Sequence, residues 1–345
     1  MDIKEILLTA IEMKASDVHL TAGRPPVFRL LGDLHPQEEW KKLMPEDTES
    51  LCREMLSSRL SEEMSAKGQV DFAYGIPGIG RFRVNVFKQR NSLTAAIRII
   101  NSEIVSLEEL NLPPVIGELA RRPRGLVLVT GPTGSGKSTT LASMIDLVNK
   151  EFKKHILTLE DPIEFLHKHK NCIVNQREIG TDTNSFSDAL RAGLREDPDV
   201  ILVGEMRDPE TISIAVTAAE TGHLVLTTLH TSSAAQTVER IIDVFPPHQQ
   251  QQIRVQLAAT IQGVISQTLL KRADETGRIA ATEILIGTPA VRNLIREGKT
   301  HQLNSMIQTG GQYGMQSLDA TLRKMIQDGT ILMKEALAQN INFQS

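Results

Sequence analysis

The eight residues 131–138 constrain this chain more than any other segment does. They read Gly-Pro-Thr-Gly-Ser-Gly-Lys-Ser and satisfy every fixed position of the phosphate-binding P-loop pattern. An apolar, strand-like run precedes them at residues 126–130, and a helix-compatible stretch follows at 139–148. In such a loop the backbone N–H groups and the positive end of the following helix face bound phosphates. The pattern predicts a site for a nucleoside triphosphate.

Two side chains of this loop carry separate roles. Lys137 is expected to reach the β- and γ-phosphates, and Ser138 is expected to bind Mg²⁺ through its hydroxyl. The predicted ligands are therefore ATP and Mg²⁺. The residues predicted to bind the nucleotide are Gly131, Pro132, Thr133, Gly134, Ser135, Gly136, Lys137, Ser138 and Thr139.

Length and apolar pattern together indicate two domains, because 345 residues exceed one small core. Residues 1–100 combine an opening amphipathic helix with short strands and form an α+β module. Residues 101–123 hold three prolines around one short helix and are expected to be the linker and hinge. Residues 124–345 begin with strands that alternate with helices, which is typical of a doubly wound, mainly parallel α/β sheet. After residue 231 we expect mostly helix, including 249–270.

Composition argues against several classes of protein. The net charge is −4 and only 3% of residues are aromatic, so nucleic acid is a poor candidate partner. Cys52 and Cys172 lie far apart without metal-type spacing, which fits a reducing cytoplasm better than a disulfide framework. Charged residues interrupt the first 20 positions, unlike a signal peptide. No apolar run approaches the length needed to span a bilayer.

Acidic side chains follow two further predicted strands. The run 155–159 leads into Glu160, Asp161 and Glu164, each of which qualifies by type as the base that takes a proton from attacking water. Asp161 also suits the N-cap of a helix. The run 200–203 leads to Glu205, which we expect to support Mg²⁺ and water. Gly204 stands before it, where an aspartate is commoner.

Histidines and arginines complete the candidate site. His230 follows the predicted strand 224–228 and is interpreted as a sensor of the γ-phosphate, and His223 before that strand is a second candidate. Structural histidines are the alternative for both. Three arginines on strands of the N-terminal module are candidates to stabilise the transferring phosphoryl group, an effect of about 10³–10⁵ in rate. Solvated surface arginines are the alternative for Arg81, Arg83 and Arg98.

These segments resemble the motifs of the secretion ATPase superfamily, which powers type II and type IV secretion and type IV pili. The similar segments are residues 131–138, 160–164, 195–199, 204–208 and 222–230. Residues 16–20 are similar to the opening of the N-terminal domain of that family. The resemblance implies a RecA-like P-loop NTPase core preceded by a PAS-like α+β domain.

The C-terminal part resembles one branch of the family, the ATPases that retract type IV pili. Residues 289–297 read Pro-Ala-Val-Arg-Asn-Leu-Ile-Arg-Glu and match the signature of that branch, with Val291 where isoleucine is usual. The long N-terminal extension and four-cysteine zinc insert of assembly ATPases are not found in the sequence. The resemblance therefore implies a motor that hydrolyses ATP to depolymerise pilin and drive twitching motility.

The same resemblance implies an assembly and assigns roles. The motor would be a cytoplasmic homohexamer at the inner membrane, acting on a platform protein and through it on pilin, with a paralogous retraction ATPase as a further partner. Glu164 becomes the favoured general base and Glu205 the Walker B residue. Arg81, Arg83 and Arg98 would complete the site of a neighbouring subunit. Arg292 and Arg296 would couple domain motion to pilus disassembly, although an ordinary amphipathic helix also explains that segment.

Three other functions stay open at this point. A paralogous assembly ATPase of pili or type II secretion shares the core motifs. A nucleic-acid translocase also uses a RecA-like core, although the acidic composition opposes it. A nucleotide-dependent assembly switch would hydrolyse ATP slowly and act by binding.

Overall fold

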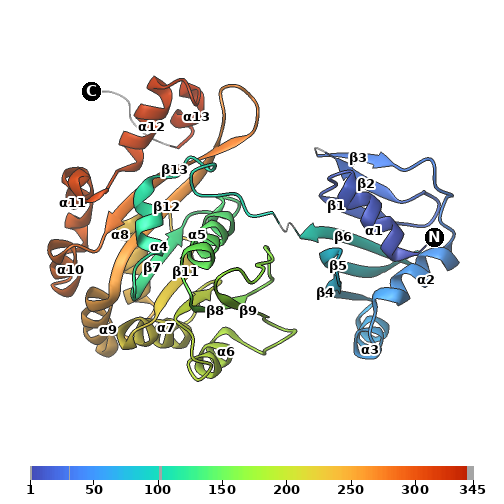
Figure 1. Cartoon of the computed structure of the whole chain (residues 1–345), viewed down its shortest axis with the longest axis horizontal. Helices are drawn as coiled ribbons and strands as arrows, with labels where there is room; N and C mark the ends of the chain where they lie inside the picture. Colours follow the sequence, from blue (N-terminus) through green and yellow to red (C-terminus); the bar gives the residue numbers. More distant parts are fainter. Residues whose placement is uncertain (1, 31, 101–102, 340–345) are drawn as a thin grey trace. The chain divides into compact units, whose positions relative to one another are not determined.

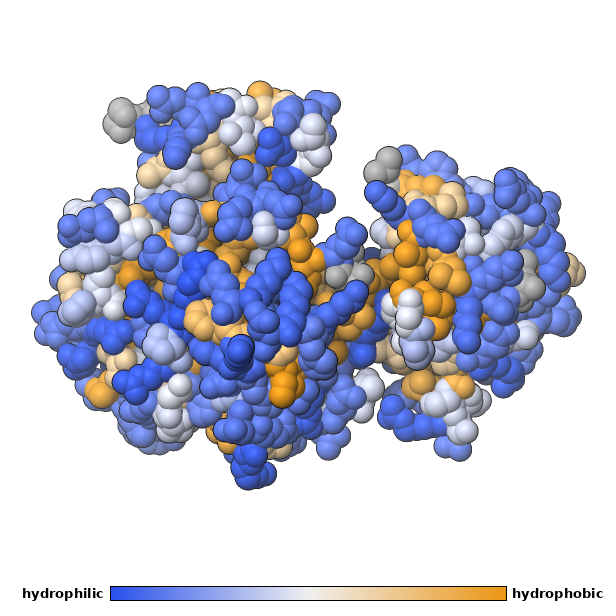
Figure 2. Space-filling view, viewed as in Figure 1, coloured by the Kyte–Doolittle hydropathy of each residue, from blue (hydrophilic) through white to orange (hydrophobic). Residues whose placement is uncertain are grey.

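The computed structural model describes residues 2–30, 32–100 and 103–339. The chain divides into two compact units, Met1–Ser102 and Glu103–Ser345, each with its own sheet and its own hydrophobic core (Figure 1). Hydrophilic side chains cover most of the face drawn in Figure 2. Within the described ranges, no helix is both long enough and apolar enough to cross a membrane.

The first unit is a six-stranded antiparallel sheet with three helices. The strand order is β3-β2-β1-β6-β5-β4. Its strands are β1 (Asp17–Leu20), β2 (Val27–Leu30), β3 (Asp33–Pro36), β4 (Gln69–Ile76), β5 (Gly80–Gln89) and β6 (Ser92–Ile100). Its helices are α1 (Ile3–Glu12), α2 (Pro45–Met55) and α3 (Ser58–Lys67).

Alternating side chains give this sheet one apolar and one charged face. Phe82 and Val84 on β5 are fully buried, whereas Arg83 between them is exposed. This is the pattern of a strand with one face on the core. Antiparallel register places Arg83 opposite Arg98 and Arg98 opposite Asp17. Arg98 Nε lies 3.0 Å from a carboxylate oxygen of Asp17, so a charged row crosses the outer face of the sheet.

The second unit is built on a seven-stranded sheet of order β13-β12-β7-β11-β10-β8-β9. All neighbours in it are parallel except β12 and β13. Every residue of the central strand β7 is buried, so both faces of the sheet are covered. Its strands are β7 (Gly125–Thr130), β8 (His155–Glu160), β9 (Ile173–Glu178), β10 (Val200–Val203), β11 (Leu224–Leu229), β12 (Ile261–Lys271) and β13 (Arg278–Ile286).

The helices of the second unit pack around this sheet. They are α4 (Pro114–Ala120), α5 (Lys137–Glu151), α6 (Phe186–Gly193), α7 (Pro209–Thr221), α8 (Ala234–Asp243), α9 (Pro247–Thr260), α10 (Pro289–Arg296), α11 (Leu303–Thr309), α12 (Leu318–Gln327) and α13 (Met333–Leu337), with short 3-10 turns η1 (Thr300–Gln302) and η2 (Gly311–Tyr313). The α/β class predicted from the sequence is confirmed.

The expected helix at 249–270 is wrong in its second half. Helix α9 ends at Thr260, and the chain continues as β12, which pairs in parallel with the P-loop strand β7. The run that begins at Ile261 is apolar almost without interruption, and periodicity alone cannot separate a buried strand from a buried helix in such a run. The C-terminal part is therefore not simply helical, because β12 and β13 complete the central sheet.

Most of the segment expected to be the linker, 101–123, groups with the second unit. Residues 101 and 102 lie outside the described residues, and those from Glu103 onward belong to the second unit. Leu107 and Leu112 are buried in its core, and the Ser143 hydroxyl on α5 lies 2.6 Å from the carbonyl oxygen of Val105. Helix α4 packs on α5 and β12. Apolar side chains around the prolines thus attach this segment to the second unit.

A substitution in α4 tests this attachment. Leu119 is 1% exposed and packs against Gly263 of β12, so Leu119→Ala should lower the free energy of unfolding by about 3 kcal/mol. The neighbouring Glu118 is exposed, and Glu118→Ala should stay within about 0.5 kcal/mol of the wild type. Urea unfolding monitored by circular dichroism measures both. Equal effects would mean that this segment is a loose linker.

Candidate active site

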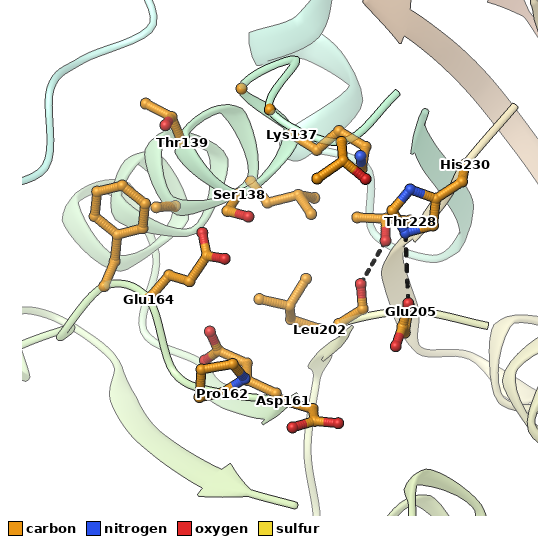
Figure 3. A pocket seen from close by; sticks show the side chains of 18 of the residues that line it. Lys137, Ser138, Thr139, Asp161, Pro162, Glu164, Leu202, Glu205, Thr228 and His230 are labelled. Carbon is orange, nitrogen blue, oxygen red and sulfur yellow. Dashed lines mark hydrogen bonds and ion pairs between the residues drawn. The ribbon is translucent and has the colours of Figure 1, made fainter. Parts of the chain in front are cut away.

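One cavity of about 560 Å³ lies where four parallel strands end. Strands β7, β8, β10 and β11 run in the same direction, so the loops after their carboxyl ends meet at one edge of the sheet. Figure 3 shows side chains that line this cavity. The sequence-predicted residues that line it are Thr133, Gly134, Gly136, Lys137, Ser138, Thr139, Glu160, Asp161, Glu164, Glu205 and His230.

The P-loop keeps its shape because its glycines allow a backbone that other residues do not. Gly131, Gly134 and Gly136 have φ of 141°, 78° and 88°. At Gly131 a Cβ atom would lie 2.2 Å from the carbonyl oxygen of Gln267 on β12. The glycine therefore permits both the left-handed turn and the close approach of the neighbouring strand.

The side chain of Gln267 on β12 supports the P-loop. Its amide nitrogen donates to the carbonyl oxygen of Ser135 at 2.7 Å, and its amide oxygen accepts from the Thr140 hydroxyl at 3.0 Å. Gln267 is 2% exposed, so these bonds are shielded from water. One buried amide thus ties the P-loop and the first turn of α5 to β12. No sequence motif marks this residue.

Lys137 is held by the loop's own carbonyl groups. Its ammonium nitrogen donates to the carbonyl oxygens of Gly131 at 2.9 Å and Pro132 at 3.0 Å. Burial lowers the pKa of Lys137, and the negative charges of Glu164 and Glu205 act in the opposite direction. Both carboxylates therefore act electrostatically on the ammonium group that is expected to reach the phosphates.

The three acidic candidates after β8 have different environments. Burial raises the pKa of Glu160, whose carboxylate accepts hydrogen bonds from Thr158 at 2.6 Å and Gln176 at 3.0 Å. Glu160 is thus committed to neighbours within the sheet. Asp161 is exposed at the cavity wall, and Glu164 is exposed with its carboxylate directed toward Ser138 (Figure 3). Of the three, Glu164 is the one whose carboxylate points toward the P-loop.

Strand β9 positions the loop that carries Glu164. The Ile163 N–H donates to a carboxylate oxygen of Glu178 at 3.1 Å. The Gln176 amide donates to the Phe165 carbonyl at 2.9 Å and accepts from the His167 N–H at 2.8 Å. This polar edge strand lacks an apolar alternation, which is why the sequence did not reveal it.

The Glu205 carboxylate lies between the side chains of Arg207 and His230. It is 2.7 Å from Nε of Arg207 and 3.5 Å from Nε2 of His230. The Thr228 hydroxyl donates to the carbonyl oxygen of Gly204, and Asp208 caps α7 through the N–H of Thr211 at 2.8 Å. These bonds fix the turn after β10. Arg207 and Thr228 were not among the residues predicted from the sequence, although Arg207 lies only two positions after Glu205.

The donor set at the cavity fits Mg²⁺. The described residues contain no group of three or more His, Cys, Asp and Glu side chains arranged for a metal ion. At phosphates, however, Mg²⁺ keeps several water molecules and takes only one or two protein ligands. Ser138 and Glu205 line the same cavity and offer a hydroxyl and a carboxylate oxygen. Their chemistry suits a hard cation that is shared with the nucleotide.

The structure does not bring His223 to this cavity, which corrects the expectation for that residue. His223 precedes β11 at its amino end, whereas the cavity lies at the carboxyl end. A strand of this length separates its two ends by about 20 Å. The His223 ring nitrogen Nδ1 lies instead 2.9 Å from the Ala218 carbonyl oxygen, at the end of α7.

Arg292 and Arg296 lie at a different cavity of about 750 Å³. The Arg292 guanidinium donates to the carbonyl oxygens of Gly287 at 2.8 Å and Ile261 at 2.9 Å. It therefore joins α10 to the start of β12, whereas Arg296 is exposed. Arg81, Arg83 and Arg98 belong to the first unit. Arg207 is the only arginine among the described residues that line the cavity at the P-loop.

Comparisons with known proteins give one consistent family. Residues 1–338 match the family described as Type II/IV secretion system protein. The chain is 51% identical over 340 residues to the "Type IV pilus retractation ATPase PilT" of Pseudomonas aeruginosa, and the match covers 97% of each chain. It is 47% identical over 339 residues to the "Twitching motility protein" of Neisseria gonorrhoeae, covering 96% of this chain and 90% of that one.

A solved structure agrees with these relatives. The crystal structure of the pilus retraction motor PilT with bound ADP superposes with a TM-score of 0.92 and 50% identity. The match covers 100% of this chain and 98% of that one.

The support from β12 can be tested by removing the Gln267 amide. Gln267→Leu keeps the volume but leaves the Ser135 carbonyl and the Thr140 hydroxyl without their partner, which should weaken ATP binding about tenfold. Thr268→Val on the same strand is the control, because its hydroxyl lies at the limit of hydrogen bonding, 3.5 Å from Gln339. Titration with a fluorescent ATP analogue measures both. Equal affinities would show that Gln267 does not support the loop.

Proposed function

The chain belongs to the type II/IV secretion system protein family, and we propose that it hydrolyses ATP to retract a type IV pilus. The secretion ATPase family and its retraction branch, both expected from the sequence, are confirmed by the relatives. The ATPase activity expected from the P-loop is likewise that of the family. Pilus retraction and twitching motility are the functions that the names of those relatives state.

One observation carries the proposal for the site. Lys137, Ser138, Glu164 and Glu205 come from three separate strand ends and line a single cavity. A phosphate-binding loop alone serves many classes of enzyme, but an exposed carboxylate opposite it supplies the base that hydrolysis needs. The geometry therefore supports transfer of the γ-phosphoryl group to water.

Each of these side chains has its own part in the chemistry. Lys137 exchanges the carbonyl oxygens of Gly131 and Pro132 for phosphate oxygens when ATP binds, and the loop N–H groups hold the remaining charge. Glu164 orients the attacking water and accepts its proton. Ser138 and Glu205 would hold Mg²⁺, which neutralises charge on the β- and γ-phosphates when bound. His230, beside Glu205, reports whether the γ-phosphate is present.

The proposed assembly is a homohexamer in which neighbours complete each site. Arg83 and Arg98 stand opposite each other on the exposed face of the first unit, with Asp17 as a countercharge for Arg98. An exposed arginine row of this kind suits a phosphate in another subunit. We therefore propose that Arg81, Arg83 and Arg98 act in trans.

The proposed site of action is the cytoplasmic face of the inner membrane. There the ring would act on the platform protein of the pilus and through it on pilin, with a paralogous retraction ATPase as a further partner. Arg296 is exposed on α10 and suits contact with an acidic partner surface, while Arg292 holds that helix in place.

Glu164→Gln tests hydrolysis-driven retraction directly. The amide cannot accept a proton, so turnover should fall by about 10²–10⁴ while ATP binding persists. Asp161→Asn is the matched control, since Asp161 lines the same cavity but lies closer to β8. In the native host, cells with Glu164→Gln should carry abundant surface pili and fail to twitch.

Other phenotypes contradict the proposal in different ways. Bald cells would make the protein an extension motor, because pili would then need its hydrolysis to form. Normal twitching with Glu164→Gln would favour a switch that acts by binding. Loss of turnover with Asp161→Asn alone would move the base to that residue.

Mixing two inactive variants tests the arginines. Arg83→Ala should lower turnover by about 10³ while leaving ATP bound. Lys137→Ala subunits keep Arg83. An equal mixture of the two variants should recover about a quarter of wild-type turnover, because random assembly places an intact Lys137 beside a neighbour's intact Arg83 at about a quarter of the sites. Arg29→Ala on the same sheet, 3.7 Å from Asp17, is the control and should stay active. A mixture no more active than its components would exclude action in trans.

A further inference from the structure

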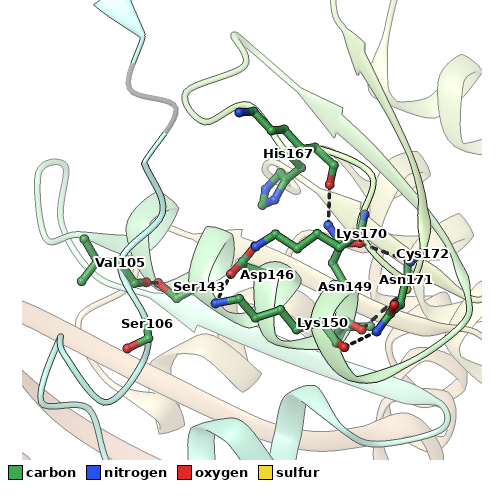
Figure 4. Close-up of polar contacts among 12 residues, drawn as sticks. Val105, Ser106, Ser143, Asp146, Asn149, Lys150, His167, Lys170, Asn171 and Cys172 are labelled. Atoms are coloured by element: carbon green, nitrogen blue, oxygen red, sulfur yellow. Dashed lines mark hydrogen bonds and ion pairs between the residues drawn. The ribbon is translucent and has the colours of Figure 1, made fainter.

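The helix that follows the P-loop carries a row of buried polar side chains. On α5, Ser143, Asp146 and Asn149 are spaced three residues apart, so they follow one side of the helix. All three are buried, where polar groups need partners. Figure 4 shows that each of them has a partner outside the helix, and that Asp146 also pairs with Lys150 on α5 itself.

Asn149 fastens one loop to this helix. Its amide nitrogen donates to the Lys168 carbonyl at 2.7 Å, and its amide oxygen accepts from the N–H groups of Lys170 at 3.1 Å and Cys172 at 3.3 Å. One fully buried side chain thus satisfies three backbone groups just before β9.

Asp146 binds the same loop through charge. Its carboxylate accepts from the ammonium groups of Lys170 on the loop and Lys150 on α5, the latter at 2.8 Å. Burial alone would raise the pKa of Asp146, but the hydrogen bonds from Lys150 and Lys170 outweigh it and hold that pKa below its usual value. The carboxylate is therefore ionised, and a charge-assisted hydrogen bond joins the loop to the helix.

The loop held in this way is the one that carries Glu164. Residues 161–172 connect β8 to β9. Gln176 and Glu178 on β9 hold its first half, and α5 holds its second half. His167 lies between the two halves and lines the catalytic cavity. Because α5 begins at Lys137, a single helix connects the phosphate-binding loop to the loop of the base.

We infer that Lys170 and Asp146 are positioning residues for ATP hydrolysis, whose ion pair fixes the Glu164 loop against helix α5. The inference rests on the proposed role of Glu164 as the base. A displacement of about 1 Å at a reacting group can cost about 100-fold in rate. Nucleotide binding depends instead on Lys137 and the loop N–H groups, which this ion pair does not touch.

The two lysines offer a matched pair of variants. Both bond to the Asp146 carboxylate, and both are partly exposed, at 39% for Lys170 and 53% for Lys150. Only Lys170 belongs to the loop. Steady-state ATPase assays should show that Lys170→Met lowers kcat by about 10-fold to 100-fold with an unchanged KM for ATP. Lys150→Met should leave both constants at wild-type values, and Lys170→Arg should recover most of the kcat.

A double variant separates positioning from a general loss of structure. Once Glu164 is replaced by glutamine, its position no longer matters, so Lys170→Met should cost nothing further in that background. Equal kcat values for the two lysine variants would overturn the inference, as would a further loss in the double variant. If Glu164→Gln alone kept wild-type turnover, the proposed base would fail and this inference with it. If Glu164→Gln is inactive but the two lysine variants have equal kcat values, the inference about Lys170 fails while the proposed base stands.

Discussion

The hydrogen-bonded register of strand β7 between β11 and β12 is the constraint on which the site depends. Thr130, the last residue of β7, stands opposite Leu229 on one side and Ser266 on the other. The next residue must turn sharply beside the backbone of β12, and only glycine fits there. Parallel pairing therefore sets both where the P-loop begins and which residue can begin it.

The same pairing gathers the rest of the chemistry. Strands β8, β10 and β11 run parallel to β7, so Glu164, Glu205 and His230 reach one cavity from distant parts of the chain. A second layer of polar contacts then holds each loop. The Gln267 amide braces the P-loop, and the polar ends of β9 and α5 brace the loop of Glu164. Rigid supports of this kind keep reacting groups aligned, which hydrolysis requires.

Local patterns in the sequence were sufficient to predict the P-loop, the helix that follows it and the acidic residues that follow strands β8 and β10. They were not sufficient for β12, because an apolar run that begins at Ile261 suits a buried helix as well as a buried strand, and pairing with β7 decides between them. Gln267 and Gln176 act across the fold and leave no local signal. His223 was misplaced for another reason, since only the carboxyl ends of parallel strands face the cavity. Arg292, whose coupling role stays a prediction, bonds to backbone carbonyls that come together only in the folded sheet and that no local pattern reveals.

A crystal structure of the protein with a non-hydrolysable ATP analogue and Mg²⁺ tests the central claim most directly. The account predicts that the γ-phosphate occupies the cavity between Ser138 and Glu164. It also predicts that the Lys137 ammonium has left the Gly131 and Pro132 carbonyls for the phosphates. A water molecule should lie between the Glu164 carboxylate and the γ-phosphorus. A nucleotide bound elsewhere, or a Glu164 carboxylate turned away from that water, would contradict the account.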